Sequence, residues 1–467
     1  MRLIKAIEEK GCFWLDDNQE DKIQGTLKID KNGEILLELF GEISRSSTSL
    51  INSDNVDYYH INGIVDNKYV TLIGCYTRKF KMLLPSGFHE VLVSANMAIL
   101  GVGYSSDEEL LFEKVNFSFS DADEWFDVSG TDKKILKNDE GGDLGYQLHY
   151  TPQEPIIFEL LDGYSIEVKF KASVNDIDKT HLNTIQESIV LSIFSDVNKP
   201  LDEFTEQIFK LGQFLSFMTG RLINLDSLNG LSKILDSESN EVSAKQDIYY
   251  SSVFNSNESS SSKMEEPLLK FTEIRSINPD FFKNWMLAYE SLSPALALYF
   301  AYQSGAYRFL DSKFLALAQG LETFHRRTSS ELSMSESDFE KMLSEIIDNC
   351  PATHKKWLEM KLYFANELSL RKRLQDLFEP YIDLFGSKKD IKNTVGKIVT
   401  TRNYLTHYNL ELKKQASTGR DLLKTVKSME VLFTIHFLAI IGMDKEDIIK
   451  MTKTSPILMR QFRYIKN

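Results

Sequence analysis

The side chains of this sequence that could carry out chemistry are concentrated in residues 388–409, KKDIKNTVGKIVTTRNYLTHYN. Four residues separate Arg402 from His407, and Asn403 directly follows the arginine. Arginine presents a planar fork of donors that matches phosphate oxygens. The reference pKa of histidine lies near neutrality, so its imidazole can accept or release a proton. The combination predicts a metal-independent ribonuclease site in which Arg402 holds the phosphate, His407 moves a proton, and Asn403 orients the backbone or the phosphate.

The same stretch is predicted to begin as an amphipathic helix, because Ile391, Val395, Ile398 and Arg402 recur at steps of four, three and four. Arg402 therefore has the phase of the buried stripe, where a guanidinium needs a partner or a groove. Five residues span about 140° around an ideal helix, so Arg402 and His407 of one chain would diverge. We expect both a terminating turn near Thr406 and completion of the site by a second chain.

By itself this spacing is weak evidence, because the Arg and His content of the chain gives about 0.24 such pairs by chance. On spacing alone, the alternative to a catalytic site is a structural one, in which the arginine forms a salt bridge and the histidine lies in the last turn of the helix. Residues 309–327 predict a second helix, with Glu322, His325 and Arg326 grouped within one turn. Glu322 and Arg326 could support the site or contact RNA, or form an exposed ion-pair cluster. Tyr408 could stack on a base or pack against the helix.

Composition and charge limit the class of protein. The 467 residues are 42% hydrophobic and 26% charged, which is typical of globular chains rather than disordered ones. The net charge of −14 is uneven: residues 305–467 contain 27 basic and 20 acidic side chains, a balance of +7, whereas residues 1–304 carry −21. The basic side holds the Arg–His pair, which favours a nucleic-acid partner, although a solvated helical surface explains the same balance.

Other features indicate the compartment. No apolar run reaches the roughly 18 residues of a membrane span, and MRLIKAIEEKG lacks the apolar core of a secretory signal. Cys12, Cys75 and Cys350 are far apart and odd in number, which favours neither disulfides nor a zinc site. We expect a cytoplasmic protein with no cofactor and no metal. Walker, dinucleotide-glycine, HExxH and GxSxG motifs are absent from the sequence, which gives little support to those enzyme classes.

The elements that must position the Arg–His pair predict an α+β chain. Residues 1–225 are predicted to be antiparallel and β-rich, as a sandwich or open barrel, with hairpin turns at Asp30–Gly33 and Asp162–Gly163 and a helix near 200–222. Residues 226–277, which include the run Ser256–Ser262, are predicted to be a polar loop or linker. Residues 278–467 are predicted to be an all-α antiparallel bundle. The apolar helix 420–443 would be central, with His436 in its core.

Several segments resemble a known family. RNYLTH (Arg402–His407) has the form of the HEPN signature, and FLALAQGLETFHRR (Phe314–Arg327) resembles the first conserved helix of the ApeA-like HEPN group. In the N-terminal half, GCFWLDD, IQGTLKIDKNGEILLELFGEI, HINGIVDNKYVTLIGC and ADEWF resemble the domain that accompanies this type of HEPN domain in ApeA proteins. The resemblance covers nearly the whole chain, in the same domain order.

The resemblance implies an RNA endonuclease of bacterial anti-phage defence that acts through abortive infection. It also implies a homodimer in which the Arg and His of two chains face a shared groove, a phage-derived trigger, and tRNA as one target. The N-terminal domain would sense the trigger or restrain the nuclease. The alternative is a non-catalytic dimeric protein that uses the helical bundle as an interaction module and binds a ligand through the β domain.

Overall fold

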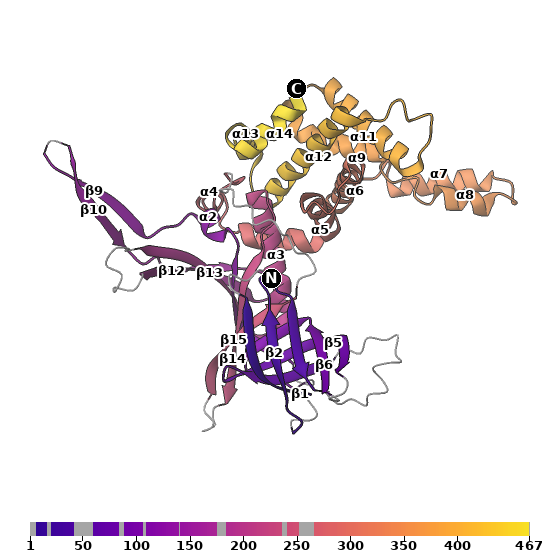
Figure 1. The fold of residues 1–467 in the computed structure, drawn as a ribbon. Coiled ribbons are helices and arrows are strands. Elements are labelled where there is room, and N and C mark those ends of the chain that lie inside the picture. Colours follow the sequence, from indigo (N-terminus) through magenta and orange to yellow (C-terminus); the bar gives the residue numbers. More distant parts are fainter. Residues whose placement is uncertain are drawn as a thin grey trace. The chain divides into compact units, whose positions relative to one another are not determined.

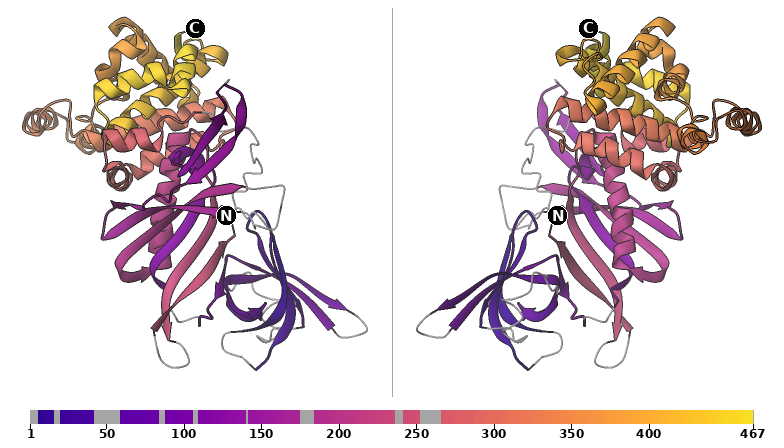
Figure 2. Two further views of the ribbon diagram at one scale, coloured as in Figure 1. Left: turned by 90° about the vertical axis from the view of Figure 1, so that its left-hand side faces the viewer. Right: turned by 90° about the vertical axis from the view of Figure 1, so that its right-hand side faces the viewer.

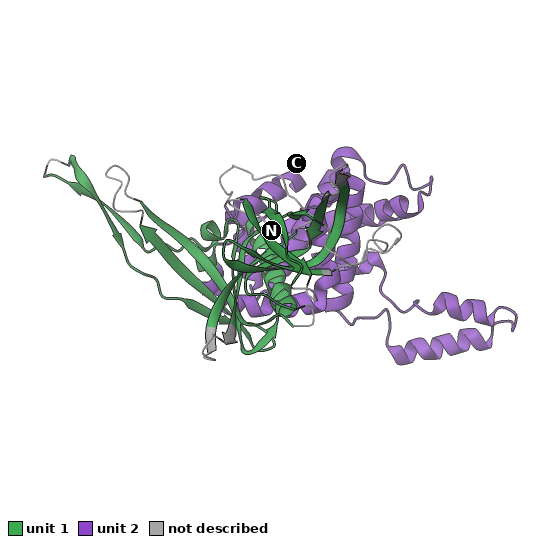
Figure 3. Ribbon diagram, turned by 60° about the horizontal axis from the view of Figure 1, so that its bottom comes forward, with its two compact units in different colours: residues 1–219, 223–265, 270–273 green, residues 220–222, 266–269, 274–467 purple. Residues whose placement is uncertain are grey.

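The structure of the chain is a computed structural model that describes residues 6–15, 20–41, 59–83, 88–105, 109–139, 141–174, 184–235, 241–251 and 266–466. The chain divides into two compact units, coloured separately in Figure 3. Unit 1 comprises residues 1–219, 223–265 and 270–273, and unit 2 comprises residues 220–222, 266–269 and 274–467. The predicted Ser-rich run Ser256–Ser262 lies outside the described residues.

The first six strands of unit 1 close into an antiparallel ring (Figure 2). They are β1 Ile7–Leu15, β2 Ile23–Ile29, β3 Ile35–Phe40, β4 Tyr59–Val65, β5 Lys68–Leu83 and β6 Phe88–Ala95. Alternate side chains such as Leu27, Ile29, Leu37 and Leu39 fill the interior. The ring is closed rather than the expected sandwich or open barrel. The long β5 makes closure possible, because its first half pairs with β4 and its second half pairs with β6.

The rest of the sheet in unit 1 runs in the order β11-β12-β13-β8-β14-β15-β7, and β7 joins it to β5 of the ring. These strands are β7 Met97–Gly101, β8 Leu111–Phe119, β11 Ile156–Glu159, β12 Tyr164–Val174, β13 Ile185–Pro200, β14 Leu225–Leu235 and β15 Glu241–Tyr250. The strands β9 Thr131–Lys137 and β10 Asp143–Tyr150 form a separate hairpin. Asp30–Gly33 and Asp162–Gly163 connect β2 to β3 and β11 to β12, so both predicted hairpins are confirmed.

Helix α3, Leu201–Thr219, contacts β8 and β13 on one face of this sheet (Figure 2). The helix predicted near residues 200–222 is confirmed, and its apolar stripe is buried, including Phe204, Ile208, Leu211 and Leu215. The short helix α2, Ala122–Phe126, adds Trp125 and Phe126, whose rings pack edge to face. Apolar side chains at helical spacing thus give α3 one face that packs against the sheet.

The prediction of a loop or linker over residues 226–277 is wrong for much of that range. Strand β15 and all of β14 except Leu225 lie within it and are inserted between β8 and β7. Helix α4, Phe271–Ile277, lies at its end. The stretch reads as polar because one face of β14 carries Ser227 and Asn229, which hydrogen-bond to Ser118 and Asn116 of β8. Cross-strand partners of this kind satisfy side chains that composition alone assigns to a loop.

Unit 2 is helical, as predicted (Figure 1). Its helices are α5 Phe281–Gln303, α6 Leu310–Thr328, α7 Glu336–Asp348, α8 Lys355–Leu362, α9 Leu370–Phe378, α10 Ile382–Phe385, α11 Lys388–His407, α12 Gly419–Ile440, α13 Lys445–Thr454 and α14 Pro456–Lys466. Helix α12 contacts α5, α6, α11, α13 and α14, which confirms its central place. Gly320 lets α6 approach α12, because a Cβ there would lie 2.7 Å from Cζ of Phe433.

Across the described residues, no helix combines the length and the apolar character that crossing a bilayer requires.

Candidate functional site

Helix α11 begins with a complete capping box. The hydroxyl of Ser387 accepts a hydrogen bond from the Asp390 amide at 3.3 Å, and the Asp390 carboxylate accepts one from the Ser387 amide at 2.9 Å. Together they satisfy two amides that would otherwise be unpaired at the helix start. Ile391, Val395 and Ile398 are buried, so the predicted helix and its apolar face are confirmed.

The end of α11 differs from the prediction. The helix continues through His407 and ends at Tyr408, whose φ of 49° is left-handed and whose amide donates to the Tyr404 carbonyl at 2.6 Å. The expected terminating turn near Thr406 is therefore wrong. The Thr406 hydroxyl instead donates to the Arg402 carbonyl at 2.7 Å, as Ser and Thr often do inside helices. Arg402 and His407 consequently stay on one continuous helix, about 140° apart around its axis.

Arg402 does not enter the buried stripe that its spacing predicts. Its side chain is 37% exposed, and Thr401 is fully buried beside it. The Thr401 hydroxyl accepts a hydrogen bond from the Ser417 amide at 2.9 Å, so a neutral side chain with a fixed partner occupies the core position. The guanidinium lies 3.3 Å from Oδ1 of Asn403, the predicted neighbour, and 3.9 Å from Oε2 of Glu322 on α6.

Glu322 connects the two arginines predicted for the site. One carboxylate oxygen lies 3.3 Å from Arg326, one turn further along α6, and the other is the partner of Arg402. The Glu322 side chain is only 20% exposed, and its single charge faces two guanidinium groups. Arg326 also pairs with Glu367 at 2.5 Å. The predicted ion pair within α6 is therefore present, and it extends toward Arg402.

These ion pairs extend to a buried arginine, Arg373, that the sequence analysis did not predict as part of the site. Arg373 on α9 is 5% exposed; its Nε donates to the Leu368 carbonyl at 3.0 Å, its Nη1 lies 3.3 Å from Nδ1 of His325, and its Nη2 lies 3.6 Å from Glu367. Because the guanidinium is a donor only, Nδ1 of His325 is the acceptor, and Nε2 carries the proton toward Asp376, 3.5 Å away. Burial, and then the charge of Arg373, lower the pKa of His325, which keeps the ring neutral.

We call the connected set Arg402, Glu322, Arg326, Glu367, Arg373, His325 and Asp376 the charge network. The sequence groups His325 with Glu322 and Arg326 in one turn of α6, but the His325 ring is buried against α9. The signal that could have found Arg373 is its phase, because it lies one turn before the buried Leu377 in an amphipathic helix. The missing information was the partner, since His325 precedes Arg373 by 48 residues.

His407 and Tyr408 lie at the open end of the helix. Both are exposed, Tyr408 by 68%, and the Tyr408 ring packs edge to face on Tyr404 with ring centroids 5.7 Å apart. Within the described part of the chain, the His407 imidazole makes no hydrogen bond or ion pair, and none joins it to Arg402. The structure thus brings Arg402, Asn403, Glu322 and Arg326 together, and it leaves His407 and Tyr408 on a neighbouring exposed surface.

A helical hairpin that the sequence did not single out projects beside the charge network. We call α7 and α8, with the residues joining them and the following two aromatics, the arm (residues 336–364; Figure 1). Neither helix has a buried residue, and Trp357, Met360, Tyr363 and Phe364 are each more than half exposed. Asn366 anchors its base through hydrogen bonds with both the amide and the carbonyl of Met334.

His436 lies in the core of the helical unit. Nε2 of His436 hydrogen-bonds to the Leu377 carbonyl at 2.9 Å, and the ring packs on Phe324 and Tyr381. Burial lowers the pKa of His436 to about 4, which confirms a neutral core histidine.

Two family models match the sequence. The model described as ApeA N-terminal domain 1 matches residues 8–285, more than half of the chain, and the model described as Apea-like HEPN matches residues 315–447. The second range contains Glu322, Arg402 and His407. Comparison with curated proteins finds no match, and comparison with solved structures finds none either.

Proposed function

The chain belongs to the ApeA family and carries an Apea-like HEPN domain, and from this premise we propose that it is a metal-independent RNA endonuclease of bacterial anti-phage defence. The observation that carries the proposal lies on α11. The exposed imidazole of His407 ends the helix. Arg402 precedes it by five residues, and its guanidinium faces Glu322. A cation for a phosphate and a group that moves a proton near neutral pH are what RNA cleavage requires.

One copy of the site is geometrically incomplete for this reaction. Because α11 is continuous from Arg402 to His407, the two side chains leave the helix about 140° apart. Two copies that pack their α11 ends together would bring the Arg402 of one chain toward the His407 of the other. The proposal therefore includes a homodimer, with two copies of Arg402 and His407 around one RNA strand.

The chemistry needs no added reactant, because RNA supplies its own nucleophile. Neutral His407 takes the proton of the ribose 2′-hydroxyl, and the 2′-oxygen forms a bond to phosphorus as the bond to the 5′-oxygen breaks. Arg402 stabilises the negative charge on the phosphoryl oxygens. The His407 of the second chain, in its protonated form, gives a proton to the departing 5′-oxygen. The products are a 2′,3′-cyclic phosphate and a 5′-hydroxyl.

The arm supplies the second element of RNA binding in this proposal. Exposed Trp357, Tyr363 and Phe364 lie close in sequence to Lys355, Lys356 and Lys361, along and beside α8. Aromatic rings that stack on bases, together with lysines near phosphates, are typical of single-stranded nucleic-acid binding. Tyr408, beside His407, is a further stacking group. Trp357→Ala should weaken binding of an RNA loop about 5- to 100-fold, measured by fluorescence anisotropy, and leave the unfolding midpoint unchanged.

The biological context of the proposal is abortive infection. The N-terminal domain would restrain the nuclease until a phage-derived trigger appears, and tRNA is the first target to test. Expression with and without phage infection distinguishes a restrained nuclease from an inactive one. The wild type should become toxic only on infection, and a variant without nuclease activity should be non-toxic under both conditions.

The central test compares two histidine variants on total RNA and on tRNA. His407→Ala should reduce cleavage at least about 100-fold, as expected for loss of a general base. His149→Ala, an exposed histidine on β10, should cleave like the wild type. EDTA should leave the rate unchanged, and end-group analysis should find 2′,3′-cyclic phosphates.

Cleavage that persists in His407→Ala, or that disappears with EDTA, would refute the mechanism. A dimer that binds RNA but never cleaves it, with trigger and infection included, would favour the non-catalytic assembly module instead. Dimer formation is measured separately by light scattering, so failure of the chemistry and failure of the assembly give different results.

A further inference from the structure

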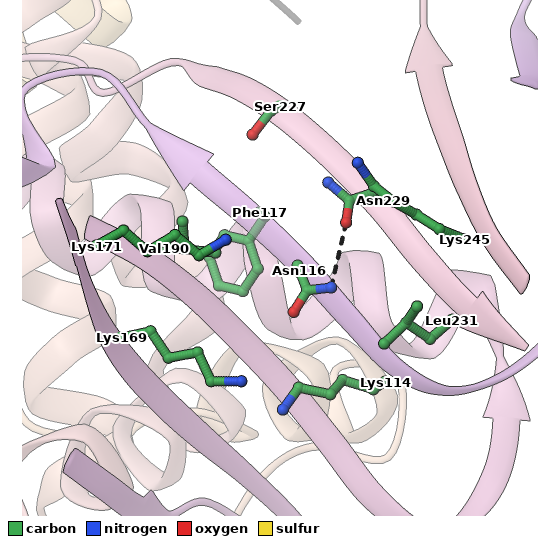
Figure 4. A pocket seen from close by; sticks show the side chains of 10 residues that line it. All are labelled: Lys114, Asn116, Phe117, Lys169, Lys171, Val190, Ser227, Asn229, Leu231 and Lys245. Atoms are coloured by element: carbon green, nitrogen blue, oxygen red, sulfur yellow. Dashed lines mark hydrogen bonds between the residues drawn. The ribbon is translucent and has the colours of Figure 1, made fainter. Parts of the chain in front are cut away.

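The face of the unit 1 sheet opposite α3 contains a hollow of about 390 Å³. Its side chains come from five strands, β8, β12, β13, β14 and β15 (Figure 4). Four of its ten lining residues are lysines, namely Lys114, Lys169, Lys171 and Lys245. This concentration of positive charge is unexpected in the part of the chain that is strongly acidic overall.

The strand register explains why these residues meet. Residues directly opposite each other in antiparallel strands point to the same face. One cross-strand row therefore contains Lys114, Leu231 and Lys245, and the next contains Asn116 and Asn229. In β12, Lys169 pairs with Val190 of β13, and Lys171 follows two residues later on the same face. Figure 4 shows Lys114 and Lys169 extending toward each other.

The charges around the hollow do not cancel. Glu167 pairs with Lys114 at 2.5 Å and with Lys169 at 3.1 Å, and Asp247 pairs with Lys245 at 3.4 Å. Within the described residues, Lys171 has no carboxylate partner. Four ammonium groups thus face two carboxylates. Each ammonium has three donors, so one bond to Glu167 leaves Lys114 and Lys169 able to donate to a ligand.

The remaining lining residues add polar and apolar contacts. Asn116 donates to Oδ1 of Asn229 at 3.2 Å and accepts from the hydroxyl of Ser192 at 2.6 Å. This fixes both amides on the sheet, and Ser227 lies beside them. Val190 and Leu231 provide apolar surface between the lysines. Ligand sites commonly combine apolar surface with a few fixed polar groups, in volumes of about 300–1,000 Å³.

We propose that this hollow binds a nucleotide, with its phosphates on Lys114, Lys169 and Lys171 and its flat base over Leu231. Lysine serves as a compact point charge for phosphate groups. The fixed amides of Asn116 and Asn229 face the region between base and phosphates, where ribose hydroxyls and ring nitrogens offer partners. The site belongs to unit 1, so it gives the N-terminal domain a small-molecule input that is separate from the nuclease residues.

Calorimetry on the full chain tests the proposal with three probes: ATP, tripolyphosphate and adenosine. ATP should bind, and its affinity should fall as salt rises. Tripolyphosphate should bind at least about 10-fold more weakly, because it lacks the base, and adenosine should show no binding. Equal affinity for ATP and tripolyphosphate, or no binding of ATP at millimolar concentration, would overturn the nucleotide assignment.

Charge variants locate the site. The double variant Lys169→Gln with Lys171→Gln should weaken ATP binding at least about 10-fold. Lys134→Gln with Lys137→Gln removes the same charge from exposed positions of β9 and should have no effect. Lys171→Glu reverses one charge at an exposed position, so it tests the site even if the double variant misfolds, and it should abolish binding. An equal loss in the β9 control would show non-specific attraction and refute the site.

Two further results separate this site from other functions. His407→Ala should bind ATP like the wild type, so nucleotide binding and RNA cleavage can fail independently. If tRNA binding depends on Lys169 and Lys171 while ATP and tripolyphosphate do not bind, the hollow is an RNA surface and the proposal is wrong.

Discussion

Replacing Glu322 with glutamine tests whether the charge network sets the position of the proposed catalytic arginine. Glu322 lies 3.9 Å from Arg402 and 3.3 Å from Arg326, so the substitution keeps size and hydrogen bonding but removes the shared negative charge. The variant should fold normally, because the Glu322 side chain is partly exposed and its neighbours reach water.

The size of the effect follows from exposure. Two unit charges about 4 Å apart interact by about 1 kcal/mol in water and about 4 kcal/mol at an effective dielectric constant of about 20. The Arg402 side chain is 37% exposed and the Glu322 side chain is 20% exposed. Solvent therefore screens the pair, and its interaction energy should be near the value in water, about 1 kcal/mol. Loss of this orientation should lower kcat about five-fold. KM for RNA should stay equal or fall, because a negative charge beside the phosphate site has been removed.

The assay is steady-state cleavage of a labelled RNA hairpin, with Glu446→Gln on α13 as a matched, exposed control. A double-mutant cycle with Arg402→Lys should show non-additive effects on kcat, because the two side chains contact each other. A loss of 100-fold or more in Glu322→Gln would place Glu322 in the chemistry itself. Additive effects in the cycle would refute the orienting role.

Three further predictions concern stability. Arg373→Met removes a 5% exposed guanidinium with three partners and should cost about 3 kcal/mol in urea unfolding of the helical unit; an unchanged midpoint would contradict a structural role. The pKa of His436 is about 4 in the folded chain, so its contribution is present above pH 6.5 and is lost as pH falls toward 4, by up to about 3 kcal/mol. His436→Gln should flatten that pH dependence in urea titrations. Gly320→Ala should reduce the free energy of unfolding by about 1–3 kcal/mol, and so lower the thermal midpoint, despite the helix propensity of alanine, because its Cβ would meet Phe433 at 2.7 Å.

Short-range patterns in the sequence determined much of the helical unit. The period of Ile391, Val395 and Ile398 predicted α11 and its buried face. Turn residues at Asp30–Gly33 predicted the β2–β3 hairpin for the same reason. In each case the determining interactions join residues a few positions apart, so the linear sequence contains both partners.

The failures come from interactions between distant residues. Residues 226–235 and 241–250 read as a loop because polar side chains dominate. They form β14 and β15, which pair with each other and also with β8 and β7, more than a hundred positions earlier. The position of Arg402 depends on Glu322, eighty residues away, and on Thr401, which takes the buried position through Ser417.

Residue types and spacing thus identified Arg402 and His407 and the helix that carries both. The continuous helix that separates their side chains, the charge network behind Arg402 and the lysine-lined hollow were decided only by tertiary structure. The physical reason is that a charged or polar group can be buried only where other groups in space pair with it. Those partners belong to other helices and strands, whose positions no local pattern contains.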